Sequence, residues 1–102
     1  MKRENNDEKI YYKPDGNWCW VYILKSKKDE KCYIGSTNDL KRRFKEHNSG
    51  KIFSTKNRCP LILVYYEAFR SEKDARLREQ ALKNYGQGIT NLYKRISNSL
   101  TI

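Results

Sequence analysis

The chain alternates short apolar runs with segments in which apolar residues recur every three or four positions. Two runs rich in Val, Ile, Tyr and Trp, residues 19–24 and 31–34, predict strands, and the polar residues 25–30 between them predict a hairpin turn. The longest apolar run, LILVYYEAF at residues 61–69, predicts a third strand. Its continuity favours the central position of an antiparallel sheet, because a strand covered on both faces needs no polar alternation.

A helix is predicted after the second strand, over residues 39–48, with Thr37 or Asn38 as its cap and Gly50 as its left-handed stop. Four residues follow the i, i+3, i+4, i+7 spacing of one inward face: Leu40, Arg43, Phe44 and His47. An arginine on such a face needs an anionic or aromatic partner, or must extend outward to solvent.

Two further helices are predicted, one from Ser71 to residue 85 and a last one over residues 91–100. At about 100° per residue, Glu79 lies at the border of the apolar face of the former. Its carboxylate could simply pair with a nearby base: Arg76, Arg78 or Lys83. These elements predict an α/β fold in which a small three-stranded antiparallel sheet is flanked by helices.

Composition narrows the function classes. A chain of 102 residues is most economically one domain, here residues 18–102, and the polar residues 1–17 predict a mobile N-terminal arm. The net charge of +10 favours a polyanionic partner, because each neutralised phosphate releases counterions. No stretch has the ~20 apolar residues of a membrane span, which leads us to expect a cytoplasmic protein. Three cysteines without a CxxC pair and a single histidine argue against a disulfide framework or a structural zinc site.

Basic residues are concentrated on the outer side of the first helix and in the loop that follows it. Glu46 is the only acid between Lys41 and Arg58. A run of this kind is often only a solvated face, but here it predicts a surface that follows nucleic-acid phosphates. Its members are Lys41, Arg42, Lys45, Lys51, Lys56 and Arg58.

The order of four motifs resembles the GIY-YIG nuclease superfamily, in its small single-domain bacterial form. The motifs are Val21-Tyr22-Ile23, Tyr33-Ile34-Gly35, Arg43 ten residues after Tyr33, and His47 four residues later. One departure is that Trp20-Val21-Tyr22 stands where the family has Gly-Ile-Tyr. The family's chemistry needs only the tyrosine of that motif, so the resemblance stands.

The resemblance implies a role for each residue of a phosphodiester-cleaving site. Tyr22 would be the general base beside Tyr33, Arg43 would neutralise the scissile phosphate, and His47 would bond a tyrosine or take a proton. Glu79, in a segment similar to the family's second helix, would hold one Mg²⁺ or Mn²⁺. A late asparagine is also implied, for which Asn91 has a suitable spacing, with Asn84 and Asn98 as competitors. An ordinary tyrosine has a pKa of about 10, so Tyr22 as base needs a metal ion or Arg43 nearby.

These inferences predict a divalent-metal-dependent endonuclease acting on DNA. The alternatives are a basic nucleic-acid-binding module without independent activity and a protein that binds ribosomal RNA. Glu79 discriminates between them, because a binding module needs no carboxylate facing phosphates. The sequence leaves open the oligomeric state, and also whether the Tyr22 and Tyr33 hydroxyls share one face of the hairpin.

Overall fold

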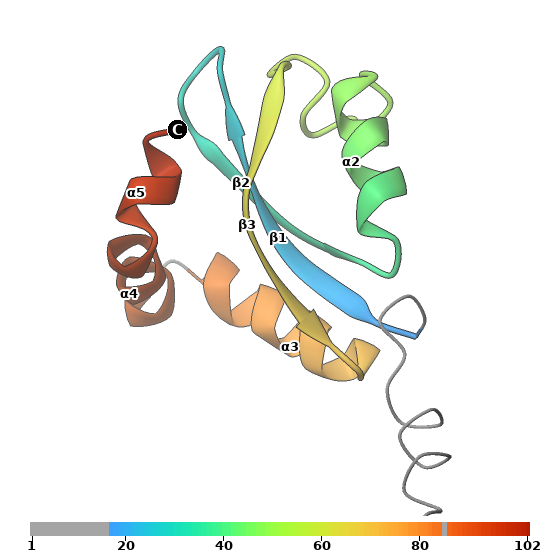
Figure 1. Cartoon of the computed structure of the whole chain (residues 1–102), viewed down its shortest axis with the longest axis vertical. Helices are drawn as coiled ribbons and strands as arrows, with labels where there is room; N and C mark the ends of the chain where they lie inside the picture. Colours follow the sequence, from blue (N-terminus) through green and yellow to red (C-terminus); the bar gives the residue numbers. More distant parts are fainter. Residues whose placement is uncertain (1–16, 85) are drawn as a thin grey trace, which may run out of the picture.

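The computed structural model describes residues 17–84 and 86–102, so the predicted N-terminal arm lies outside the described residues except for Asn17. The elements follow one another around a single sheet (Figure 1). Their order is β1 (Cys19–Ser26), β2 (Cys32–Thr37), α2 (Leu40–Asn48), β3 (Leu61–Phe69), α3 (Glu72–Lys83), α4 (Gln87–Arg95) and α5 (Ser97–Leu100). The predicted fold class, a three-stranded antiparallel sheet flanked by helices, is confirmed.

The sheet has the order β2-β1-β3, so the prediction that residues 61–69 form the central strand is wrong. The central strand is β1, whose successive residues Val21, Tyr22, Ile23 and Leu24 are at most 1% exposed. Side chains alternate between the faces of a strand, so this burial requires cover on both sides. In contrast, β3 carries an exposed Tyr66 and the charged Glu67, which an edge strand tolerates.

Two apolar clusters lie on opposite faces of the sheet. On one face Val21, Ile23 and Ile34 pack with Ala75 and Leu82 of α3 and with Ile89 and Leu92 of α4. On the other face Tyr22, Leu24 and Leu61 pack with Leu40 and Phe44 of α2. Figure 1 shows α2 on one side of the strands and α3, α4 and α5 on the other. Helix α2 therefore covers the face that carries the tyrosines.

The N-terminal ends of α2 and α3 have side-chain caps. Asp39, and not Thr37 or Asn38, caps α2, because its carboxylate accepts a hydrogen bond from the backbone N–H of Arg42 at 3.1 Å. The Thr37 hydroxyl accepts a hydrogen bond from the Asp39 backbone N–H at 3.1 Å, which stabilises the turn just before the helix. The predicted stop at Gly50 has φ +80°, in the left-handed region that glycine adopts without strain. Ser71 caps α3 as predicted.

The C-terminal helix differs from its prediction. It begins at Gln87 instead of 91 and ends at Arg95, and α5 follows after a break at Ile96. Glycine is unfavourable inside a helix, yet Gly86 is the N-cap of α4 and Gly88 lies within its first turn. None of the described helices is long and apolar enough to cross a lipid bilayer.

Candidate active site

Tyr22 and Tyr33 lie on the same face of the β1–β2 hairpin, beneath α2. The register pairs Tyr22 with Gly35 and Leu24 with Tyr33, so the tyrosines are diagonal neighbours across the two strands. Their ring centroids are 6.4 Å apart. The question that the sequence left open is thereby answered, because both rings face α2 and its inward-pointing residues.

Gly35 makes room for the Tyr22 side chain. A Cβ atom at this position would lie 2.5 Å from the Tyr22 hydroxyl oxygen, 2.6 Å from its Cζ and 3.1 Å from Tyr33 Cε2. Only glycine allows the phenol to cross the backbone of β2 so closely. The predicted strand ended at Ile34, whereas β2 continues to Thr37 and so contains Gly35; a glycine inside a strand often marks a close approach of this kind.

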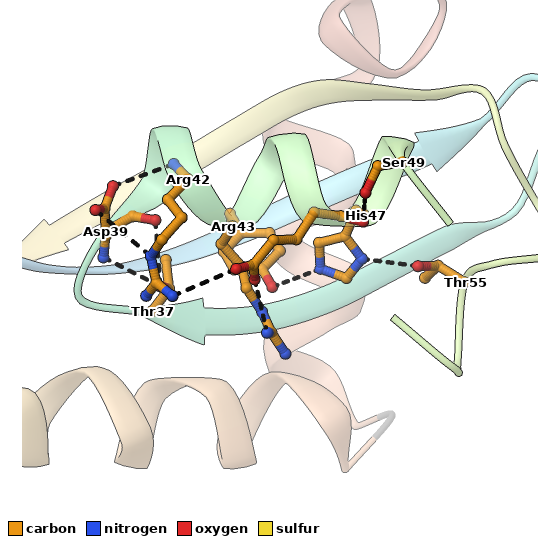
Figure 2. A network of polar contacts seen from close by, with 9 residues as sticks. Thr37, Asp39, Arg42, Arg43, His47, Ser49 and Thr55 are labelled. Atoms are coloured by element: carbon orange, nitrogen blue, oxygen red, sulfur yellow. Dashed lines mark hydrogen bonds and ion pairs between the residues drawn. The ribbon is translucent and has the colours of Figure 1, made fainter. Parts of the chain in front are cut away.

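His47 connects the tyrosines to the loop after α2. Its Nε2 lies 2.9 Å from the Tyr22 hydroxyl, and its Nδ1 lies 2.7 Å from the hydroxyl of Thr55. The ring meets that of Tyr33 edge-on, with centroids 5.0 Å apart. Figure 2 shows the imidazole between α2 and the sheet, joined to Thr55. Tyr22, His47 and Thr55 are all at most 1% exposed, so this polar chain is buried, with the Tyr22 hydroxyl at the end next to the partly exposed Arg43.

Burial sets the protonation states of this chain. It lowers the pKa of His47 to about 4, and the positive charge of Arg43 adds to the effect while Glu46 opposes it. Burial also raises the pKa of Tyr22 to about 12, although a hydrogen bond and the charge of Arg43 act in the opposite direction. At neutral pH the histidine is therefore uncharged and the tyrosine is a phenol.

A neutral imidazole has one donor and one acceptor nitrogen, so the two hydrogen bonds of His47 are linked. In one tautomer the Tyr22 hydroxyl donates to Nε2 and the Nδ1–H donates to Thr55 Oγ1; in the other the Nε2–H donates to the Tyr22 oxygen and the Thr55 hydroxyl donates to Nδ1. Transfer of the Tyr22 proton to His47 requires the first tautomer, in which Thr55 accepts from Nδ1–H and Nε2 is free to accept.

Arg43 extends from the inward face of α2 with its guanidinium half-exposed, and its Nη1 pairs with Glu46 Oε1 at 3.2 Å. The predicted need of an inward arginine for an anionic partner is met in this way. The guanidinium is a partly exposed neighbour of the buried chain, and its positive charge lowers the pKa of both Tyr22 and His47.

Glu79 approaches the tyrosines from α3, on the other side of β2. Its Oε1 accepts a hydrogen bond of 2.5 Å from the Ser36 hydroxyl, and its Oε2 pairs with Lys83 at 2.8 Å. The same Lys83 ammonium lies over the Tyr33 ring, 5.7 Å from its centroid. The negative charge of Glu79 also contributes to the raised pKa of Tyr22. Residues from β1, β2, α2 and α3 therefore converge at the β2 edge.

Sequence reasoning named most of this cluster and missed two members. Pairing of Glu79 with Lys83 was one of three alternatives, and it is the one observed; Arg78 pairs instead with Glu67 at 2.9 Å. Ser36 and Thr55 were not anticipated. Ser36 directly follows the motif glycine, which could have drawn attention to it, but a threonine eight residues beyond His47 carries no such signal.

A single carboxylate suits one kind of metal ion. Among residues 17–84 and 86–102, no group of three or more His, Cys, Asp and Glu side chains is placed to hold a metal. Mg²⁺ commonly binds through one or two carboxylates, retains several waters and takes further oxygens from a phosphate. Glu79 fits this donor set, and its side chain, which is 20% exposed, already pairs with a cationic group in the Lys83 ammonium.

The predicted basic surface divides into paired arginines and unpaired lysines. Arg42 pairs with Asp39 and Glu46, and Arg58 pairs with Asp29 at 2.9 Å. Figure 2 shows Arg42 turned toward Asp39. Within the described part of the chain, no acid pairs with the four lysines of this surface, which are all exposed: Lys41, Lys45, Lys51 and Lys56.

The side chain of Asn91 pairs within its own helix. It is exposed on α4, where its side-chain oxygen accepts a hydrogen bond from Gln87 Nε2 at 2.9 Å. Its competitors are also exposed, Asn84 at the end of α3 and Asn98 in α5. Among the described residues, no hydrogen bond joins any of the three asparagines to Glu79 or to the tyrosines.

One of the comparisons with known proteins identifies the kind of domain. A family model described as the GIY-YIG catalytic domain matches residues 18–94. A UPF0213 protein of Clostridium perfringens is 46% identical over 65 residues, which is 63% of this chain and 69% of the relative. One of Staphylococcus haemolyticus is 41% identical over 69 residues, 67% of this chain and 83% of the relative. The solution NMR structure of a UPF0213 protein from Bacillus halodurans is 35% identical, with a TM-score of 0.49 over 78% of this chain and 84% of that one.

Proposed function

Because the chain belongs to the GIY-YIG catalytic domain family, we propose that it is a divalent-metal-dependent endonuclease that hydrolyses phosphodiester bonds in DNA. The family supports a nuclease role acting on nucleic acids. The observation that carries the finer proposal is the convergence of a neutral proton-accepting chain, Tyr22–His47, with a guanidinium and a carboxylate at the β2 edge.

Hydrolysis requires a water molecule that loses a proton as its oxygen attacks phosphorus and the leaving oxygen departs. In this proposal the Tyr22 phenol takes that proton on its oxygen while passing its own to Nε2 of His47, 2.9 Å away. A transfer in one movement avoids a free phenolate, which the raised pKa of Tyr22 disfavours. Thr55 would stabilise the imidazolium through the Nδ1–H bond.

Arg43 and Glu79 would act on the phosphate. The guanidinium can donate two parallel hydrogen bonds to the scissile phosphate and neutralise charge that grows in the transition state. Glu79 would hold one Mg²⁺ or Mn²⁺, in place of the Lys83 ammonium at Oε2. When bound, such an ion polarises the phosphate and stabilises the leaving oxygen.

Substrate binding would also strengthen the base. The charge of Arg43 is one of the two causes that lower the pKa of His47. A phosphate bound to the guanidinium would cancel part of that repulsion, so His47 would accept a proton more readily with DNA present than without it. His47 would thus be a stronger base in the complex with DNA than in the free protein.

The test is incubation with supercoiled, branched and single-stranded DNA in Mg²⁺ or Mn²⁺. We expect metal-dependent cleavage that Glu79→Gln and Tyr22→Phe abolish, with DNA binding in EDTA nearly unchanged, because neither change touches the basic surface. Arg43→Ala should lower cleavage strongly and binding modestly.

Cleavage by Glu79→Gln at the parental rate would refute the assigned role of the carboxylate. DNA binding without cleavage of any substrate would favour the nucleic-acid-binding module instead. Salt-sensitive binding to RNA alone, independent of Mg²⁺, would favour the protein that binds ribosomal RNA.

A further inference from the structure

Phe53 lies in the loop between α2 and β3 and is 83% exposed, although a phenylalanine ring is among the most costly side chains to leave in water. The proposed cleavage mechanism does not use it. A single exposed apolar residue is common on protein surfaces, so the significance of this ring depends on the groups around it.

The loop around Phe53 is held by its backbone. The Thr55 N–H donates to the Ile52 carbonyl at 3.1 Å, and the Arg58 N–H donates to the Thr55 carbonyl at 2.9 Å. The Arg58 carbonyl in turn accepts from the Ser26 hydroxyl at 2.6 Å. Thr55 is fully buried and bonded to His47. Phe53 is thus presented from an anchored turn, two residues from the buried chain of the candidate active site.

Two lysines lie close to Phe53 in the sequence, and one of them contacts its ring. The Lys56 ammonium lies 5.0 Å from its centroid, a cation–π contact that leaves both groups exposed. Lys51 stands two residues before Phe53 and has no acid partner among the described residues. An apolar protein surface would not require these cations, whereas a polynucleotide offers phosphates for the lysines and flat bases for the ring.

We propose that Phe53 and Lys56 form a stacking platform for an unpaired base of the nucleic-acid substrate. In an intact duplex both faces of a base are already stacked on neighbours, so a free aromatic ring gains contact chiefly with a base that is flipped out, bulged or single-stranded. The inference rests on the proposed nucleic-acid function and deepens it. It names unpaired or distorted strands as the preferred substrate class, with the unpaired base held beside the cleavage site.

The test measures binding in EDTA, so that it does not depend on cleavage. Fluorescence anisotropy compares a fully paired labelled duplex with the same duplex containing one unpaired 2-aminopurine, whose emission is quenched by stacking. Phe53→Ala and Phe53→Leu should weaken binding to the second DNA by about fivefold or more and the first by less than twofold. Both variants should remove the quenching that the parent protein produces.

Two variants serve as controls. Phe53→Trp preserves an aromatic face and should restore both affinity and quenching. Leu77→Ala removes an apolar side chain that is 55% exposed on α3 and should change neither. Because Phe53 makes little buried contact, its variants should melt at the parental temperature, which separates a lost platform from a lost fold.

Equal affinity of Phe53→Ala and the parent for the DNA with the unpaired base would overturn the platform. An equal loss on both DNAs would do the same, because paired bases offer no free face. So would loss of binding to anionic lipid vesicles with DNA binding unchanged, which would assign the ring to a membrane surface. If unpaired DNA is bound through Phe53 but never cleaved, the platform stands and the endonuclease proposal fails.

Discussion

Replacing Gly35 by alanine tests whether the site depends on the close crossing of Tyr22 over β2. The new Cβ would lie 2.5 Å from the Tyr22 hydroxyl oxygen and 2.6 Å from Cζ, closer than non-bonded atoms approach. The phenol must therefore move, although it is 1% exposed and packed with Leu24 and Leu61. Its hydrogen bond to His47, 2.9 Å long, cannot survive that movement unchanged.

The expected effect on stability follows from overpacking. Inserting one methyl group into a close-packed site typically costs about 1–3 kcal/mol of the free energy of unfolding. In a domain of this size each kcal/mol lowers the melting temperature by about 4–8 °C. The effect on cleavage should be larger, because displacing a catalytic group by about 1 Å can cost on the order of a hundredfold in rate.

The assay is thermal unfolding by circular dichroism, paired with cleavage measured well below the melting temperature. Gly88→Ala is the matched control, because a Cβ there meets nothing within 4 Å and lies in a helix, where alanine is favoured. Combining Gly35→Ala with Tyr22→Phe should recover part of the stability, since the hydroxyl contact is removed while the contact with Cζ remains. A Gly35→Ala protein that melts and cleaves like the parent would refute the reasoning.

Three further outcomes are expected. The pKa of His47 is lowered to about 4 in the folded state, so between about pH 6.5 and 4 the unfolded state binds more protons and the free energy of unfolding should fall by up to about 3 kcal/mol as the pH drops. Urea unfolding at several pH values would measure this fall and NMR would measure the pKa of this single histidine; an imidazole that titrates near 6.5 would contradict the prediction. Lys83→Met should tighten Mn²⁺ binding by a few fold in calorimetry, because an ammonium no longer competes at Glu79, and weaker binding would exclude that competition. Neutralising three unpaired lysines together, Lys41, Lys45 and Lys51, should flatten the salt dependence of duplex binding. An unchanged slope would exclude this surface as the binding site.

Local patterns predicted the elements of this fold better than their arrangement. Residues 61–69 form a strand as expected, but apolar length did not make that strand central. The better signal is burial on both faces, and within the shorter β1 run four successive residues are buried. Edge and central strands differ in which helices pack on the two faces of the sheet at that strand, and a single sequence does not give this tertiary arrangement.

The candidate site was predictable where a motif fixes spacing and not where tertiary contacts fix position. Tyr22, Tyr33, Arg43 and His47 fall within one hairpin and one helix, so their proximity follows from local geometry. Glu79 could be placed at a helix border, yet its contact with Ser36 depends on how α3 docks. Thr55 lies in an irregular loop, whose path no periodicity describes. The roles assigned to these residues stay predictions.

The ring of Tyr33 lies near both His47 and Lys83, so the cluster has a buried, dry half around His47 and an exposed, wet half around Lys83. The dry half holds protons and no net charge, so dissolved ions have nothing there to screen. The wet half holds charges that dissolved ions reach. Acidity would then act on whether His47 can accept a proton and ionic strength on how firmly a polyanion is held, and Arg43 would link the two because its charge lowers the pKa of His47.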